Sequence, residues 1–226
     1  MSVEFSAIWL TLKLAGLSTL LLMLVAIPVS WWLSRWNSRF KAVVQACVAL
    51  PLVLPPTVLG FYLLLAFAPD SLIGEMWLSI TGERLAFTFE ALVFGSVIYS
   101  FPFAVQPLYA GFAQLHPHYL HTAKMLNLPW HVRLQRVVLP AVRPSLLIAA
   151  GLSFAHTVGE FGVVLMIGGN IPGETRVVSI ALFDQVESLN YGSAHQLAAA
   201  LLVFSLFLLI GLYWLQGRRR LKWNVM

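Results

Sequence analysis

The sequence predicts an all-α membrane protein that crosses the bilayer about five times, and three observations predict this fold. Hydrophobic residues make up 59% of the 226 residues and charged residues only 10%. A soluble globular chain carries about 45–50% apolar and about 25% charged residues, so this chain has too few charges to cover a water-exposed surface. The mean hydropathy is +0.83. Finally, five apolar segments each approach or exceed the roughly 20 residues that a helix needs to cross the hydrocarbon core.

The five expected spans differ in regularity. The first and the last, about 8–33 and 197–215, are continuous apolar helices, so the N-terminus is expected to be a retained span and not a cleaved signal peptide. The second and third, 47–68 and 87–109, contain prolines. The fourth segment, 137–167, is too long for one perpendicular span and contains prolines and glycines, so we expect it to be broken or tilted.

The distribution of charge predicts the orientation. With five spans, segments 34–46, 111–136 and the tail after 216 lie on one side, and they hold ten of the fourteen basic residues and no acidic residue. Cytoplasmic loops carry the excess of Lys and Arg, so the N-terminus is expected outside and the C-terminus in the cytoplasm. The net charge of +5 therefore indicates basic cytoplasmic loops and not a nucleic-acid partner.

The remaining segments are expected to be connections within one transmembrane domain over residues 1–226. Loop 69–86 is interpreted as a connector. The outer stretch 168–194 retains apolar residues, and we expect a short helix there that packs on the bundle or dips into it. The single cysteine, Cys47, excludes an intrachain disulfide framework.

The cytoplasmic segment 111–136 is longer than a connector requires. Residues 119–128 predict a short helix with Tyr119, Thr122, Ala123 and Leu126 on one face, where the small residues let another surface approach. Asn127 suits a helix end because asparagine tolerates the left-handed conformation. The alternative is a helix that lies on the lipid headgroups.

Three motifs resemble the permeases of ABC importers. Aligning segment 111–136 with that family's E-A-A loop on Leu139-Pro140 places His121-Thr122-Ala123 on E-A-A and Asn127 on the conserved glycine. LPLVLPPTVLG (50–60) resembles the second-span motif of the molybdate and sulfate group. GEFGVVLMIGGNIPGETR (159–176) resembles the same group, and its IPGETR portion is most like molybdate permeases.

The resemblance implies a type I ABC importer permease fold in the bacterial inner membrane. It implies a homodimer that binds two copies of a peripheral ATPase, receives its anion from an extracytoplasmic binding protein and works by alternating access. Molybdate is the expected cargo, with sulfate, thiosulfate or tungstate as alternatives. The chain itself has no GxxxxGK[ST] phosphate loop, so ATP hydrolysis is expected in a separate subunit and no cofactor is expected here. The implied ATPase-docking residues are Leu120, His121, Thr122, Ala123, Leu126, Asn127, Leu128 and Arg133.

Glu160 is the main candidate for the translocation pathway or gate. It lies in an apolar segment between Gly159 and Gly162, and an ionisable residue inside a membrane indicates function. A carboxylate repels an oxyanion, so Glu160 is not expected to hold the anion itself. The alternative is a structural hydrogen bond, with His156 as one partner. Hydroxyl groups at Thr57, Ser153 and Thr157 are further pathway candidates, although each could instead bond to its own helix.

Three other functions receive less support. Four histidines lie in the docking loop (His116, His118, His121 and His131), but loop solvation explains them more simply than a metal site does. An intramembrane enzyme that uses Glu160 and His156 would lack a nucleophile motif. A proton-coupled secondary transporter with Glu160 as proton carrier would lack the internal repeats of that class.

Overall fold

The computed structural model describes residues 2–223, with side chains for all of these except 2–4, 117, 121, 122, 124 and 216–223. Every regular element in this range is a helix. The first five helices are α1 (Ser2–Arg35), α2 (Lys41–Val53), α3 (Pro56–Phe67), α4 (Leu72–Thr81) and α5 (Phe89–Ala113). Segment 111–136, the predicted docking segment, contains α6 (Pro117–Met125), α7 (Trp130–Arg133) and the start of the π-helix η1 (Leu134–Val138), and the short helix α8 (Leu139–Ala141) follows it. The chain then continues through α9 (Arg143–Val158), α10 (Gly162–Gly168), α11 (Val178–Glu187) and α12 (Tyr191–Trp223).

The described residues contain three to five candidate membrane spans, a range that includes the predicted count of about five. Phe5–Arg35, Phe89–Ala113 and Tyr191–Leu215 are each long and apolar enough to cross a membrane, and two bent helix pairs bring the number to five if each pair is one span. One of these pairs, Trp130–Ala141 with Arg143–Val158, bends by 73°. A further break at 159–161 separates α9 from α10, so the fourth segment is broken, as predicted.

The second predicted span differs from a single straight helix. Its halves, α2 and α3, meet at an angle of 107°. Leu54 and Pro55 are extended between them, with ψ of 135° and 137°. The cause is local, because a residue that precedes proline is pushed out of the helical region, and here two prolines follow Leu54 in succession.

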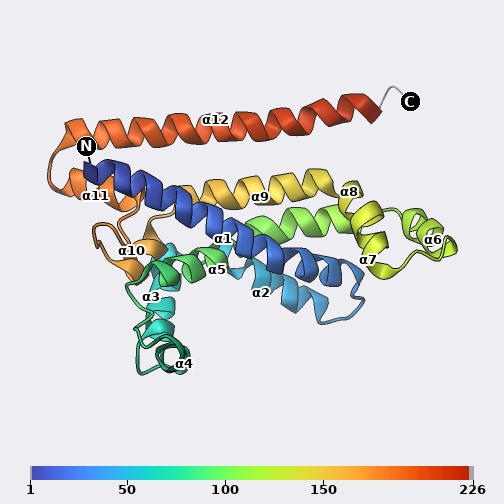
Figure 1. Cartoon of the computed structure of the whole chain (residues 1–226), viewed down its shortest axis with the longest axis horizontal. Coiled ribbons are helices and arrows are strands. Elements are labelled where there is room, and N and C mark those ends of the chain that lie inside the picture. Colours follow the sequence, from blue (N-terminus) through green and yellow to red (C-terminus); the bar gives the residue numbers. More distant parts are fainter. Residues whose placement is uncertain (1, 224–226) are drawn as a thin grey trace.

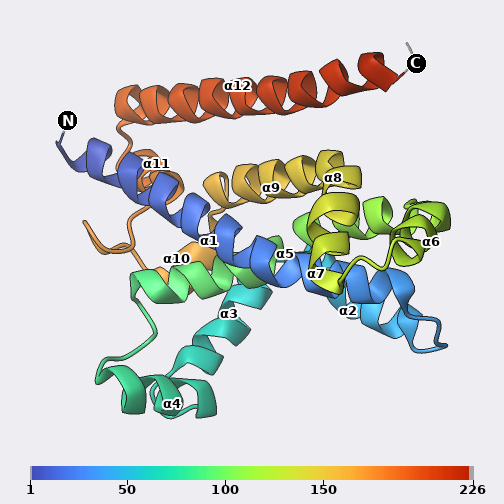
Figure 2. The same ribbon diagram turned by 45° about the vertical axis from the view of Figure 1, so that its right-hand side comes forward.

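The centre of the bundle is formed by α1, α5 and α9, which run side by side (Figures 1 and 2). Alanines at positions 26, 104 and 149, one on each of these helices, are fully buried. Small residues let helix backbones approach closely within a membrane. The docking segment lies at one end of this bundle and α10 and α11 at the other (Figure 1).

The outer segments contain two short helices. The predicted helix within 168–194 is α11, and its first residues, Val178 to Ala181, are buried. Thr11 of α1 fixes its beginning, because the Thr11 Oγ1 accepts a hydrogen bond of 2.9 Å from the Val178 N–H. Loop 69–86 is more than a connector, since it contains α4, which projects from the bundle together with α3 (Figure 2).

Candidate translocation site and docking segment

A row of buried polar side chains lies where α5 packs against α9. Ser96 and Ser100 are one turn apart on α5, and Ser153, Thr157 and Glu160 follow one face of α9 and its C-terminal end. Each of the five is at most 4% exposed. The structure thus places three of the predicted pathway residues together, in an otherwise apolar bundle.

Ser100 joins the two helices. Its Oγ lies 2.9 Å from the Nδ1 of His156 and 3.1 Å from the Oγ1 of Thr157. The imidazole of His156 also stacks on the ring of Phe103, with centroids 4.0 Å apart, and lies beside the ring of Tyr99. The predicted candidates His156 and Thr157 therefore have a common partner on α5.

The carboxyl group of Glu160 is buried without a hydrogen-bond partner among the described residues. The Ser96 hydroxyl lies beside it, but the two groups do not meet hydrogen-bond geometry, and the Ser96 hydroxyl also lacks a partner. The structure does not show the hydrogen bond to His156 that was the alternative for this residue. Burying an unpaired charged group is unfavourable, so a role that is only structural would not explain Glu160.

Glu160 lies in the break between α9 and α10, and this break faces the bend between α2 and α3. A Cβ atom added at Gly162 would lie 2.6 Å from the Cβ of Pro56, and one added at Gly60 would lie 2.7 Å from the Cβ of Met166. Near the two interruptions, therefore, the backbone of each span packs against a side chain of the other span. Thr57, the remaining pathway candidate, is exposed at the start of α3 and is not part of the polar row.

The docking segment has the predicted short helix, and the helix ends as predicted. Asn127 is left-handed, with φ of 49°. The Leu128 N–H donates to the carbonyl oxygen of Ala123 over 3.3 Å, which is the closing hydrogen bond of a Schellman motif. The side chains of His121 and Thr122 lie outside the described residues.

The exposed surface of α6 and the turn after it includes Tyr119 and Leu126 of the predicted face but not Ala123. Ala123 is only 3% exposed, whereas Met125 and Leu126 at the C-terminal end of the helix are 85% and 67% exposed. The cause is the packing of α6 on η1, which turns the small residue inward. A contact with another protein at this helix would involve the large apolar side chains near its end.

Aromatic contacts attach the docking segment to the bundle. The Trp130 ring of α7 lies 5.7 Å from the Trp31 ring of α1, and the guanidinium of Arg133 lies 5.8 Å from the Trp130 ring centroid. Leu120 of α6 packs against the core cluster that includes Leu115. The predicted docking residues Leu120 and Arg133 thus face their own chain as well as the surface.

The IPGETR motif forms a compact loop beyond α10. The Thr175 hydroxyl donates to the Gly168 carbonyl oxygen over 2.6 Å, and the Arg176 Nε donates to the Asn170 Oδ1 over 2.5 Å. Arg176 also forms an ion pair with Asp184 of α11, with an N–O distance of 3.6 Å. These contacts show that the motif's side chains hold the loop onto α11.

Sequence reasoning missed Ser96 and Ser100. The signal was available in part, since two serines four residues apart lie on one face of an apolar helix. Their role depends on residues of α9, since the partners of Ser100 are His156 and Thr157, which lie 56 and 57 residues further along the chain. No group of three or more His, Cys, Asp or Glu that could hold a metal ion occurs in the described part of the chain.

The comparisons with known proteins agree on one family. The family model described as "Binding-protein-dependent transport system inner membrane component" matches residues 26–221. The molybdenum transport system permease protein ModB of Azotobacter vinelandii is 51% identical over 97% of this chain and 96% of its own. A putative molybdenum transport system permease protein of Bacillus subtilis is 33% identical, over 91% and 90%. The sulfate transport system permease protein CysT of Escherichia coli is 31% identical, over 84% and 68%.

The fold also has solved counterparts. A bacterial ABC transporter involved in the import of alginate matches 96% of this chain and 80% of its own, with a TM-score of 0.76 and 17% identity. The alginate transporter in complex with a periplasmic protein matches 93% and 76%, with a TM-score of 0.68. At this level of identity the two structures bear on the fold alone.

Proposed function

The chain belongs to the family of binding-protein-dependent transport system inner membrane components, and on this premise we propose that it is the permease subunit of an ATP-driven ABC importer for molybdate. The observation that carries the proposal is the 51% identity to a molybdenum permease over nearly the full length of both chains. The chain is a transport component and not an enzyme, and ATP is hydrolysed by a separate subunit.

The docking segment is the proposed contact with the ATPase. Two permease copies each present α6 and the following turn to one ATPase copy, with Met125 and Leu126 entering its surface. Their high exposure supports this role, because large apolar side chains that the described part of the chain leaves mostly uncovered are available to contact another protein. The residues expected to surround this contact are Leu120, His121, Thr122, Ala123, Asn127, Leu128 and Arg133.

The polar row between α5 and α9 is the proposed gate beside the anion pathway. Hydroxyl groups and helix ends offer hydrogen bonds to a passing oxyanion without binding it tightly, which favours release. Glu160 limits how long an anion can stay, since its carboxylate repels negative charge. The anion arrives from a binding protein on the outer side, which the family description implies.

Uptake by the complete importer tests the proposal. The permease, its ATPase and its binding protein are reconstituted in vesicles, and uptake of labelled molybdate is measured with ATP or with a proton gradient alone. We expect uptake with ATP only. Uptake that follows the gradient and ignores ATP would refute the importer and favour a proton-coupled transporter.

Competition identifies the anion. A moderate excess of tungstate or of sulfate is added to the same vesicles. Preferential uptake of sulfate would mean that the proposed cargo is sulfate and not molybdate. The 31% identity to a sulfate permease is the reason to test this alternative.

A further inference from the structure

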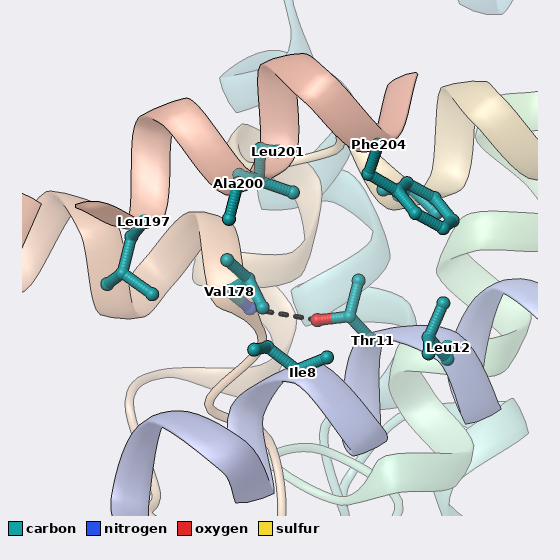
Figure 3. Close-up of a pocket in the computed structure, with 9 residues that line it drawn as sticks. Ile8, Thr11, Leu12, Val178, Leu197, Ala200, Leu201 and Phe204 are labelled. Carbon is teal, nitrogen blue, oxygen red and sulfur yellow. Dashed lines mark hydrogen bonds between the residues drawn. The ribbon is translucent and has the colours of Figure 1, made fainter. Parts of the chain in front are cut away.

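An apolar cavity of about 210 Å³ lies between α1, α11 and α12 (Figure 3). Its lining includes Ile8 and Leu12 of α1, Val178 of α11, and Leu197 and Phe204 of α12. The polar side chain in the lining is Thr11. Its hydroxyl already donates to the Ala7 carbonyl oxygen over 2.8 Å and accepts from the Val178 N–H over 2.9 Å. The cavity therefore offers little to a polar ligand.

The depth of the cavity places it in hydrocarbon. Thr11 is six residues from Phe5, where the first candidate span begins, and Phe204 is thirteen residues from the start of the last one. At 1.5 Å per residue these separations are about 9 Å and about 20 Å. Both candidate spans are longer than a hydrocarbon core of about 30 Å requires, so the cavity lies in the part of the hydrocarbon nearer to α11 and not at its centre. Even in a soluble protein an apolar cavity of about 150 Å³ stays dry and takes up apolar ligands.

The cavity is lined by two helices, α1 and α12, that are otherwise largely separate. Helix α12 packs against α9 and α11 and has little direct contact with α1, and both views show the two helices apart over most of their length (Figures 1 and 2). Ile8 of α1 and Phe204 of α12 are 39% and 38% exposed, so the cavity is not closed between these two candidate spans.

The outward surface of α12 favours lipid over another helix as its neighbour. Leu202, Val203, Leu206, Phe207 and Ile210 are between 48% and 68% exposed. Helix contacts inside membranes are rich in small residues, and these five side chains are large. In addition, a whole helix with a diameter of about 10–12 Å is too wide to enter the cavity.

We propose that this cavity binds one acyl chain of a membrane phospholipid, which fills the space between α1 and α12. Burial in a bilayer yields no hydrophobic gain, so the favourable interaction is the van der Waals contact that the lining would lose around an empty space. The bound chain would link α12 to the helix from which it is otherwise separated. The inference depends on the chain spanning a membrane and is independent of the transported anion.

Photo-crosslinking in nanodiscs tests the proposal on the full chain. The probe is a phosphatidylethanolamine with a diazirine at the middle of one acyl chain, and adducts are located by peptide mass spectrometry. In the wild type we expect adducts in segments 8–12 and 197–204 to exceed those in segment 206–210 by about threefold, although segment 206–210 has the more exposed side chains, since a chain held in a cavity stays longer than one on a convex surface.

Two alanine variants provide the matched comparison. Ala200 lines the cavity and Ala199 does not, although both are exposed on α12. Ala200→Phe should reduce the adducts on segment 8–12 about fivefold by filling the space, whereas Ala199→Phe should leave them unchanged. Uniform labelling of the wild type along α12 would refute the proposal without any variant. Protection of 197–204 from lipid together with cross-links to a second copy would also refute it.

Discussion

Ser96 and Ser100 offer a comparison at the scale of single residues. Both are fully buried on the same face of α5. Ser100 contacts His156 and Thr157, whereas the Ser96 hydroxyl has no hydrogen-bond partner in the described structure. Removing a hydroxyl that satisfies buried groups leaves those groups unpaired, but removing an unpaired hydroxyl does not.

We therefore expect Ser100→Ala to lower the free energy of unfolding by about 1–3 kcal/mol, the usual penalty for unsatisfied buried polar groups. Ser96→Ala should be neutral or stabilising. Thermal unfolding of the purified permease in detergent measures both. Equal destabilisation by the two variants would mean that Ser100 does not connect α5 with α9 as described.

At the same scale, substitution of Glu160 tests the proposed gate. Glu160→Gln keeps the shape of the side chain and removes its charge, so the melting temperature should stay the same or rise. ATP-driven uptake should fall about tenfold, equivalent to about 1.4 kcal/mol, if the carboxylate acts in the gate. Glu187→Gln, at an exposed position of α11, is the control. Unchanged uptake with Glu160→Gln would remove Glu160 from the transport mechanism.

At the scale of elements, α9 connects the proposed docking segment with the polar row. The chain enters α9 after a bend of 73°, and α9 carries Thr157 near its other end. Its sixteen residues span about 24 Å. If the ATPase binds the docking segment as proposed, a displacement of that segment would reach the polar row through α9.

The docking helix gives the first prediction about an element. Leu126→Glu should reduce the amount of ATPase that copurifies with the permease about tenfold, because a charge replaces an apolar anchor at the interface. Leu72→Glu on α4, at a position that is also highly exposed, should have no effect. Ala123→Glu is unsuitable as a test, since Ala123 is buried and the variant would disturb α6 itself. Normal copurification of Leu126→Glu would place the ATPase contact elsewhere.

The contact between α3 and α10 gives the second prediction about an element. Gly162→Ala should destabilise the permease by about 1–3 kcal/mol through overpacking against Pro56. Gly211→Ala, where an added Cβ meets nothing within 4 Å, should be neutral or slightly stabilising. Unfolding midpoints compare the two. A neutral Gly162→Ala would show that the two interruptions are not closely packed.

These elements also show what sequence can predict. The spans, the helix end at Asn127 and the break within 137–167 followed from apolar length, asparagine, proline and glycine, which act locally. The bend of 107°, the helix α4 and the inward position of Ala123 did not follow. The two prolines after Leu54 interrupt the helix locally, but they do not set the angle between its halves, and α3 packs on α10, which lies far along the chain. The direction of Ala123 depends on the packing of α6 on η1, which forms only in the folded bundle.

Orientation is a property of the whole molecule, and the predicted orientation is based on the ten basic residues that share one side if the chain has five spans. The test uses Cys47→Ser as background, because Cys47 is exposed. A membrane-impermeant thiol reagent added outside intact cells should label Glu83→Cys and not Leu126→Cys. After permeabilisation both should be labelled. The reverse pattern would place the docking segment outside the cell and end the importer hypothesis.

The close approach of Pro56 and Gly162 limits how the whole molecule can move. Each of the two interrupted spans could in principle flex alone at its own corner. Because the two corners are in close contact, neither can straighten without displacing the other, and so the chain has one shared joint. Opening of the chain would then be a single concerted step, and a covalent cross-link across that joint would be enough to immobilise both corners together.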